Sequence, residues 1–77
     1  MKLHIKYFGL LTEITHCEEE TIVFTGKTIS DLLEQLFEKY PSLQGKDFQV
    51  AQNNQVTPRG ETVSSNEIAL LPPFSGG

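Results

Sequence analysis

The longest regular pattern in the chain is Thr28-Ile29-Ser30-Asp31-Leu32-Leu33-Glu34-Gln35-Leu36-Phe37-Glu38-Lys39-Tyr40. Its apolar residues recur every three or four positions, which places them on one face of a helix; they are Ile29, Leu32, Leu33, Leu36, Phe37 and Tyr40. Thr28 is a suitable N-cap with Asp31 three residues later, and Pro41 ends the helix. No other segment is large enough to cover a sheet, so we expect this helix to face the core.

The segments before the helix alternate like two strands of a hairpin. In Lys2 to Phe8, the first set of alternating residues (Leu3, Ile5 and Tyr7) is predicted to face inward, which leaves Phe8 facing outward. Thr21 to Thr25 is rich in β-branched residues and is predicted to be the returning strand. Between them, we expect one short helical turn at Leu10 to Ile14, and a solvated turn or strand start at Glu18 to Glu20.

Three further strands are predicted after the helix. They are Phe48 to Asn53, Gln55 to Thr57 and Glu67 to Leu71, with a loop over Ser42 to Asp47 and a tight turn at Asn53-Asn54. A hairpin, one helix and a further antiparallel stretch predict an α+β chain of the β-grasp (ubiquitin-like) class. Its mixed sheet of about four to five strands would pack on one main helix. The first and last strands would lie parallel in the centre, joined through the helix.

The chain ends Leu70-Leu71-Pro72-Pro73-Phe74-Ser75-Gly76-Gly77. Proline cannot donate to a strand ladder, so we expect a folded domain over residues 1–71 and an extended tail over 72–77. Two prolines stiffen the exit, and two glycines make the tip slim enough for a narrow channel. The group at the tip is the α-carboxylate of Gly77, which suggests a tail that delivers its own C-terminus. A terminal Gly-Gly can also be accidental.

Composition and charge narrow the possible functions. The 77 residues carry 38% apolar and 21% charged residues, which is typical of one small globular domain. A net charge of −4 argues against nucleic-acid binding, and no apolar run is long enough to span a membrane. Met1 leads directly into a strand pattern rather than a signal peptide, so we expect a cytoplasmic protein. Cys17 is the only cysteine, and we expect a plain loop thiol and no metal site at His4, His16 and Cys17.

The segment Asn66-Glu67-Ile68-Ala69-Leu70-Leu71-Pro72-Pro73-Phe74-Ser75-Gly76-Gly77 resembles the C-terminus of the MoaD family, the small sulfur-carrier subunits of molybdopterin synthase. That family ends in an acidic pair, Val-Ala, two apolar residues, Pro-Pro, one apolar residue, Ser or Thr, and Gly-Gly. Tyr7-Phe8-Gly9, Glu13-Ile14 and Asn53 also resemble the family. Thr12, Gln52 and Asn66 depart from it, since the family usually has arginine, valine and aspartate there.

The resemblance implies a sulfur carrier that binds no cofactor itself. A ubiquitin-activating-type (MoeB-like) partner would use ATP to adenylate Gly77, next to Gly76, and a sulfur donor would convert the adenylate to a thiocarboxylate. The sulfur would then pass to precursor Z on a MoaE-like large subunit, in molybdenum cofactor biosynthesis. The chain supplies no acid, base or metal of its own for this sulfurtransferase. We expect the partner-binding residues to be Phe8, Leu71, Pro72, Pro73, Phe74 and Ser75.

Three alternatives remain from the sequence. The thiamine sulfur carrier also ends in Gly-Gly on a β-grasp fold, although Pro-Pro is not typical there. A ubiquitin-like protein modifier would use the same C-terminus for conjugation to lysines. The third alternative is an interaction domain whose tail has no chemical role.

Overall fold

A computed structural model describes residues 1–73 of the chain. The helices and strands are, in chain order, β1 (Lys2–Tyr7), α1 (Leu11–Thr15), β2 (Glu19–Val23), α2 (Ile29–Lys39), the 3-10 helix η1 (Pro41–Gly45), β3 (Gln49–Gln52), β4 (Gln55–Val56) and β5 (Glu67–Leu71). β5 ends at Leu71, where we predicted the folded domain to end. The division into a domain over 1–71 and a tail over 72–77 stays a prediction.

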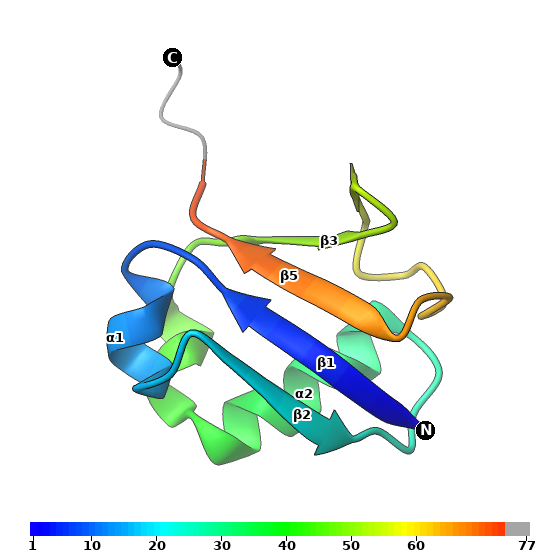
Figure 1. Ribbon diagram of the computed structural model, residues 1–77, viewed down its shortest axis with the longest axis horizontal. Coiled ribbons are helices and arrows are strands. Elements are labelled where there is room, and N and C mark those ends of the chain that lie inside the picture. The colour runs from blue at the N-terminus through cyan, green and yellow to red at the C-terminus, as the bar shows by residue number, and fades with distance from the viewer. Residues whose placement is uncertain (74–77) are drawn as a thin grey trace.

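Within the described residues, five strands form one mixed sheet in the order β2-β1-β5-β3-β4. The first and last strands, β1 and β5, lie side by side in the centre and run parallel (Figure 1). The other neighbouring pairs are antiparallel. A parallel pair needs a long crossover connection, and α2 lies on the path between β1 and β5. The predicted mixed sheet and its central parallel pair are confirmed.

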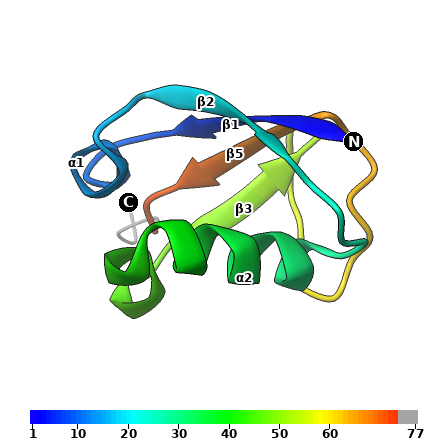
Figure 2. The same ribbon diagram turned by 90° about the horizontal axis from the view of Figure 1, so that it is seen from below.

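The core lies between the sheet and α2, which runs along one face of the sheet (Figure 2). Alternation in β1 and β5 and the periodicity of α2 turn their apolar residues toward each other. The buried residues from these three elements are Leu3, Ile5, Tyr7, Ile68, Leu70, Ile29, Leu32, Leu33 and Leu36. The predicted inward faces of β1, β5 and α2 are therefore confirmed, and no helix of residues 1–73 covers the opposite face of the sheet.

The ends of α2 are set by local hydrogen bonds. The Asp31 amide donates to Oγ1 of Thr28 at 3.1 Å, and the Thr28 amide donates back to Oδ2 of Asp31 at 3.0 Å. Together they satisfy two amides that the first turn of the helix would leave unpaired. Pro41 follows the C-cap residue Tyr40, so the helix stops where the sequence predicts.

One connecting segment differs from the prediction, and a second agrees with it. The expected loop over Ser42 to Asp47 contains most of η1, and Leu43 in it is completely buried. Proline is well tolerated at the start of a short helix, and the burial of Leu43 against the core stabilises this turn. In the predicted turn, Asn53 and Asn54 have φ of 54° and 61°, as a two-residue hairpin turn requires.

Candidate functional site

The predicted site lies where the tail leaves the central strand β5. Leu71 is the last residue of β5 and is half-buried, and Pro72 and Pro73 are exposed. The other predicted site residues, Phe74, Ser75, Gly76 and Gly77, lie outside the described residues. Their roles in partner binding and as the reacting terminus stay predictions.

The root of the tail is held by the loop that follows β1. The Phe8 amide donates to the Leu70 carbonyl at 3.2 Å, which extends the pairing of β1 and β5 by one bond. Gly9 then turns with φ +60°, and a Cβ added to it would lie 3.0 Å from Cγ of Pro72. Glycine suits both the positive φ and the close approach of the proline ring. In the sequence, Gly9 was noted only as part of the Tyr7-Phe8-Gly9 segment that resembles the MoaD family.

Thr12 holds the same loop from α1. Its Oγ1 donates to the Gly9 carbonyl at 2.9 Å, and its amide donates to the same carbonyl at 3.2 Å. At this position the resembling family usually has arginine. Here the side chain fastens the loop that lies against Pro72.

The open face of the sheet carries an apolar patch beside the tail root, formed by Phe8, Ala69 and Leu71. Lys6 pairs with Ala69 across β1 and β5, so Phe8 and Leu71 follow on the same face, opposite the buried residues. Phe8 is 44% exposed. The side chains thus face as predicted, while their role in partner binding stays a prediction.

Polar residues and a hollow border this open-face patch. Lys6 Nζ lies 3.7 Å from Glu67 Oε1, and His4 Nε2 lies 2.6 Å from Glu19 Oε1. Ala51 pairs with Ala69 across β3 and β5, and these two small side chains help to line a hollow of about 290 Å³. An apolar centre with a polar rim is the usual composition of a protein–protein interface.

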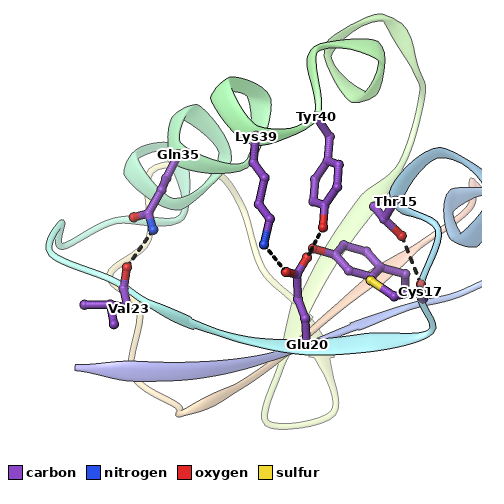
Figure 3. A network of polar contacts seen from close by, with 8 residues as sticks. Thr15, Cys17, Glu20, Val23, Gln35, Lys39 and Tyr40 are labelled. Atoms are coloured by element: carbon purple, nitrogen blue, oxygen red, sulfur yellow. Dashed lines mark hydrogen bonds and ion pairs between the residues drawn. The ribbon is translucent and has the colours of Figure 1, made fainter.

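On the core side of the sheet, the Glu20 side chain of β2 forms polar contacts with residues of β1 and α2 (Figure 3). Its Oε2 accepts hydrogen bonds of 2.6 Å from the hydroxyls of Tyr7 and Tyr40, and its Oε1 pairs with Lys39. β2 begins at Glu19, so the strand start predicted for Glu18 to Glu20 is confirmed. The predicted solvation is wrong for Glu20, whose side chain is only 14% exposed. Glu20 pairs with Ile5 in the sheet and so points to the core side. The run of three glutamates gave no signal of this.

The network shifts the pKa values of its members. Burial alone would raise the pKa of the Glu20 carboxyl. Hydrogen bonds from Lys39, Tyr40 and Tyr7 outweigh the burial and lower this pKa below its usual value of 4.5. Burial, followed by the hydrogen bond to Glu20, raises the pKa of both Tyr7 and Tyr40. All three groups are therefore held in the states that keep the network intact at neutral pH.

The remaining reactive side chains are dispersed. Cys17 is a free, half-buried thiol between α1 and β2. Over residues 1–73, no group of three His, Cys, Asp or Glu side chains is placed to hold a metal ion. No helix in the same part of the chain has the length and apolar character to cross a membrane.

A mixed sheet packed on one main helix, α2, with Pro72 and Pro73 following the central strand β5, defines a ubiquitin-like β-grasp protein. The model of the ThiS family matches residues 5–77, and the chain belongs to that family.

Individual relatives agree with this assignment. The chain is 31% identical to a molybdopterin synthase sulfur carrier subunit from Mycobacterium tuberculosis, with 100% of this chain and 99% of the relative covered. The crystal structure of SAMP1 from Haloferax volcanii superposes with a TM-score of 0.80 at 26% identity, over 100% of both chains. A putative molybdopterin converting factor subunit 1 from Pyrococcus furiosus gives a TM-score of 0.87 over 96% and 99% of the chains; at 20% identity it supports the fold alone. The resemblance seen in the sequence is thus confirmed at the level of a MoaD- and ThiS-like sulfur-carrier homologue.

Proposed function

We propose that the chain is the sulfur carrier subunit of a molybdopterin synthase. The observation that carries this proposal is the full-length 31% identity to the mycobacterial sulfur carrier subunit. The C-terminal Pro72-Pro73-Phe74-Ser75-Gly76-Gly77 segment, which resembles the MoaD family, supports it. The partners would be a MoaE-like large subunit and a MoeB-like adenylating enzyme, all in the cytoplasm.

The chemistry at the tip follows from a carboxylate being a poor electrophile. A Gly77 carboxylate oxygen attacks the α-phosphorus of ATP held by the adenylating enzyme, and pyrophosphate leaves. Sulfide then displaces AMP from the acyl carbon and gives the thiocarboxylate. With a persulfide donor, a thiol must afterwards reduce the acyl disulfide to release the same product. The thiocarboxylate sulfur displaces an oxygen leaving group from precursor Z on the large subunit. Water then hydrolyses the resulting thioester, which leaves the sulfur on the product and regenerates the Gly77 carboxylate. This chain needs no bound cofactor for these steps.

Intact mass spectrometry tests this proposal directly. The chain is incubated with ATP, sulfide and the adenylating enzyme of the same genome. We expect its mass to rise by the difference between sulfur and oxygen. The variant lacking Gly77, and one carrying an added C-terminal residue, should not gain this mass because the reacting carbon is displaced. A sulfur gain in the extended variant without loss of the added residue would contradict the proposal.

A second candidate is a protein modifier, which the structural likeness to SAMP1, a small archaeal modifier protein, favours. A modifier would appear covalently attached to lysines of other proteins after the same activation. The third, a thiamine-type carrier, shares the thiocarboxylate. Complementation separates these functions, because a molybdopterin carrier should restore molybdoenzyme activity in a strain lacking its own carrier. Rescue of thiamine synthesis alone would instead assign the thiamine pathway.

A further inference from the structure

A groove lies between α1 and the root of the tail. Its volume is about 320 Å³. Leu10 and Ile14 line it from the α1 side, and Pro72 and Pro73 line it from the tail side. It does not include any residue of the open-face patch, so it is a separate surface beside the same root.

Contacts within the chain support the walls of this groove. Leu11 and Thr15 are buried and hold α1 on the core. Thr12 fastens the Gly9 carbonyl, and Gly9 in turn lies against the ring of Pro72. A preformed groove binds a partner with little loss of conformational entropy.

Leu10 has no role in the core that would explain its apolar side chain. It is 74% exposed, whereas the neighbouring Leu11 is 3% exposed. A single exposed leucine is ordinary. Here, however, it adjoins Ile14 and two exposed prolines around one hollow, and contiguous apolar surface of this kind is typical of interaction sites.

Charged residues stand at the rim of the groove. Glu13, Lys46 and Asp47 also line it. None of the ion pairs found within residues 1–73 involves these three residues. Two carboxylates against one ammonium leave the rim net acidic, so it is complementary to an apolar side chain that is followed by a Lys or Arg.

We propose that this groove docks the adenylating enzyme, which would insert an apolar side chain there and place a neighbouring Lys or Arg near Glu13 and Asp47. The inference rests on the activation step of the proposed function. Sulfur transfer and conjugation both require that step, so this enzyme is the partner common to both candidates. An enzyme that takes the tail must lie against its root, where the groove wall is made of Pro72 and Pro73.

The test compares Leu10→Ser with Val56→Ser, a matched loss of an exposed apolar side chain on β4 at the far edge of the sheet. The dissociation constant for the purified adenylating enzyme is measured by calorimetry for the full-length chains. We expect Leu10→Ser to raise it about tenfold, in the range of an interface anchor, and Val56→Ser to leave it unchanged. Urea unfolding should give the same stability for both variants.

Charge-reversal variants test whether the adenylating enzyme places a Lys or Arg at the rim of the groove. Glu13→Lys should weaken binding and reduce its salt dependence, whereas Lys46→Glu should strengthen it. If Glu13→Lys strengthened binding and Lys46→Glu weakened it, the proposal that a Lys or Arg of the enzyme lies near Glu13 and Asp47 would be wrong. If Leu10→Ser reduced the affinity for the large subunit more than the affinity for the adenylating enzyme, the groove would not be the docking site of the adenylating enzyme.

The failure of this inference is distinguishable from failure of the proposed function. If the unmodified sequence forms no adenylate with ATP and the enzyme, the function itself is wrong. If the adenylate forms and Leu10→Ser binds as tightly as Val56→Ser, the groove does not dock the enzyme.

Discussion

Glu20 ties the C-terminal end of α2 to the edge strand β2, while Gln35 of the same helix donates to the Val23 carbonyl of β2 at 2.6 Å (Figure 3). One carboxylate accepts from two tyrosines and pairs with a lysine, so its removal leaves three donors without their partner. Because its folded-state pKa lies below 4.5, the charged form stabilises the fold. This contribution is fully present above the unfolded pKa and is lost as pH falls through the lower folded value.

We therefore expect Glu20→Gln to lower the free energy of unfolding at pH 7 by about 1–2 kcal/mol. The difference from the parent should narrow as the pH falls below about 4.5, where the parent also becomes protonated. Urea unfolding across the acid range measures it, with the exposed Glu18→Gln as control. If the difference in free energy of unfolding between the parent and Glu20→Gln did not change with pH, the charge of Glu20 would not be what stabilises the fold.

Gln52 makes two hydrogen bonds where the resembling family usually has valine. Its amide nitrogen donates to the Thr62 carbonyl at 3.0 Å, and its amide oxygen accepts from the Ser64 amide at 2.9 Å. The Gln52 side chain thus takes the place of a neighbouring strand. Among residues 1–73, the Thr62 carbonyl and the Ser64 amide have no backbone hydrogen-bond partner.

We expect Gln52→Leu to cost about 1 kcal/mol, because apolar burial partly offsets the two lost hydrogen bonds. Loss of the hydrogen bond from the Ser64 amide to Gln52 should appear as faster hydrogen exchange at this amide, measured by NMR. Gln55→Leu, at an exposed position of β4, is the control. Unchanged exchange at Ser64 would show that this amide does not depend on Gln52.

At the scale of elements, α2 depends on its first turn as well as on its apolar face. The reciprocal bonds between Thr28 and Asp31 satisfy amides that burial of Ile29 would otherwise leave without water. We expect Thr28→Ala to reduce the free energy of unfolding by about 1 kcal/mol. Ser30→Ala, exposed in the same turn, should change it by less than half as much. Equal losses in thermal or urea unfolding would mean that the cap has no special role.

At the scale of the whole molecule, we expect the two faces of the sheet to serve stability and partner binding separately. One face is covered by α2 and holds the core (Figure 2). The other face carries the open-face patch next to the tail root. Substitutions on the open face should therefore alter binding with little loss of stability.

Phe8→Ala tests this separation. We expect binding to the large subunit to weaken by about 1–3 kcal/mol, since Phe8 is an exposed aromatic beside the tail. Val23→Ala removes an exposed side chain at the far end of the same face and should bind normally. If Phe8→Ala unfolds the domain while the folded fraction binds unchanged, Phe8 belongs to the core and not to an interface.

The sequence by itself determined the main elements β1, β5 and α2 and the faces that they bury. The period of α2 and the alternation of β1 and β5 are local properties, because side-chain direction repeats every 3.6 residues in a helix and every two in a strand. The cap at Thr28, the stop at Pro41 and the turn at Asn53-Asn54 are also local, since each depends on residues a few positions apart. The Gly-Gly tail and its likeness to sulfur carriers were likewise visible in the sequence.

Tertiary structure alone decided which distant residues meet. Glu20 looked like part of a solvated acidic run until pairing with Ile5 turned it toward Tyr7 and Tyr40. Gly9 became a support for Pro72, and Leu10 a wall of a groove, only when β1 and β5 lay side by side. These contacts join positions up to about sixty residues apart in sequence. No local pattern encodes them, because the register of the central parallel pair sets which side chains come together.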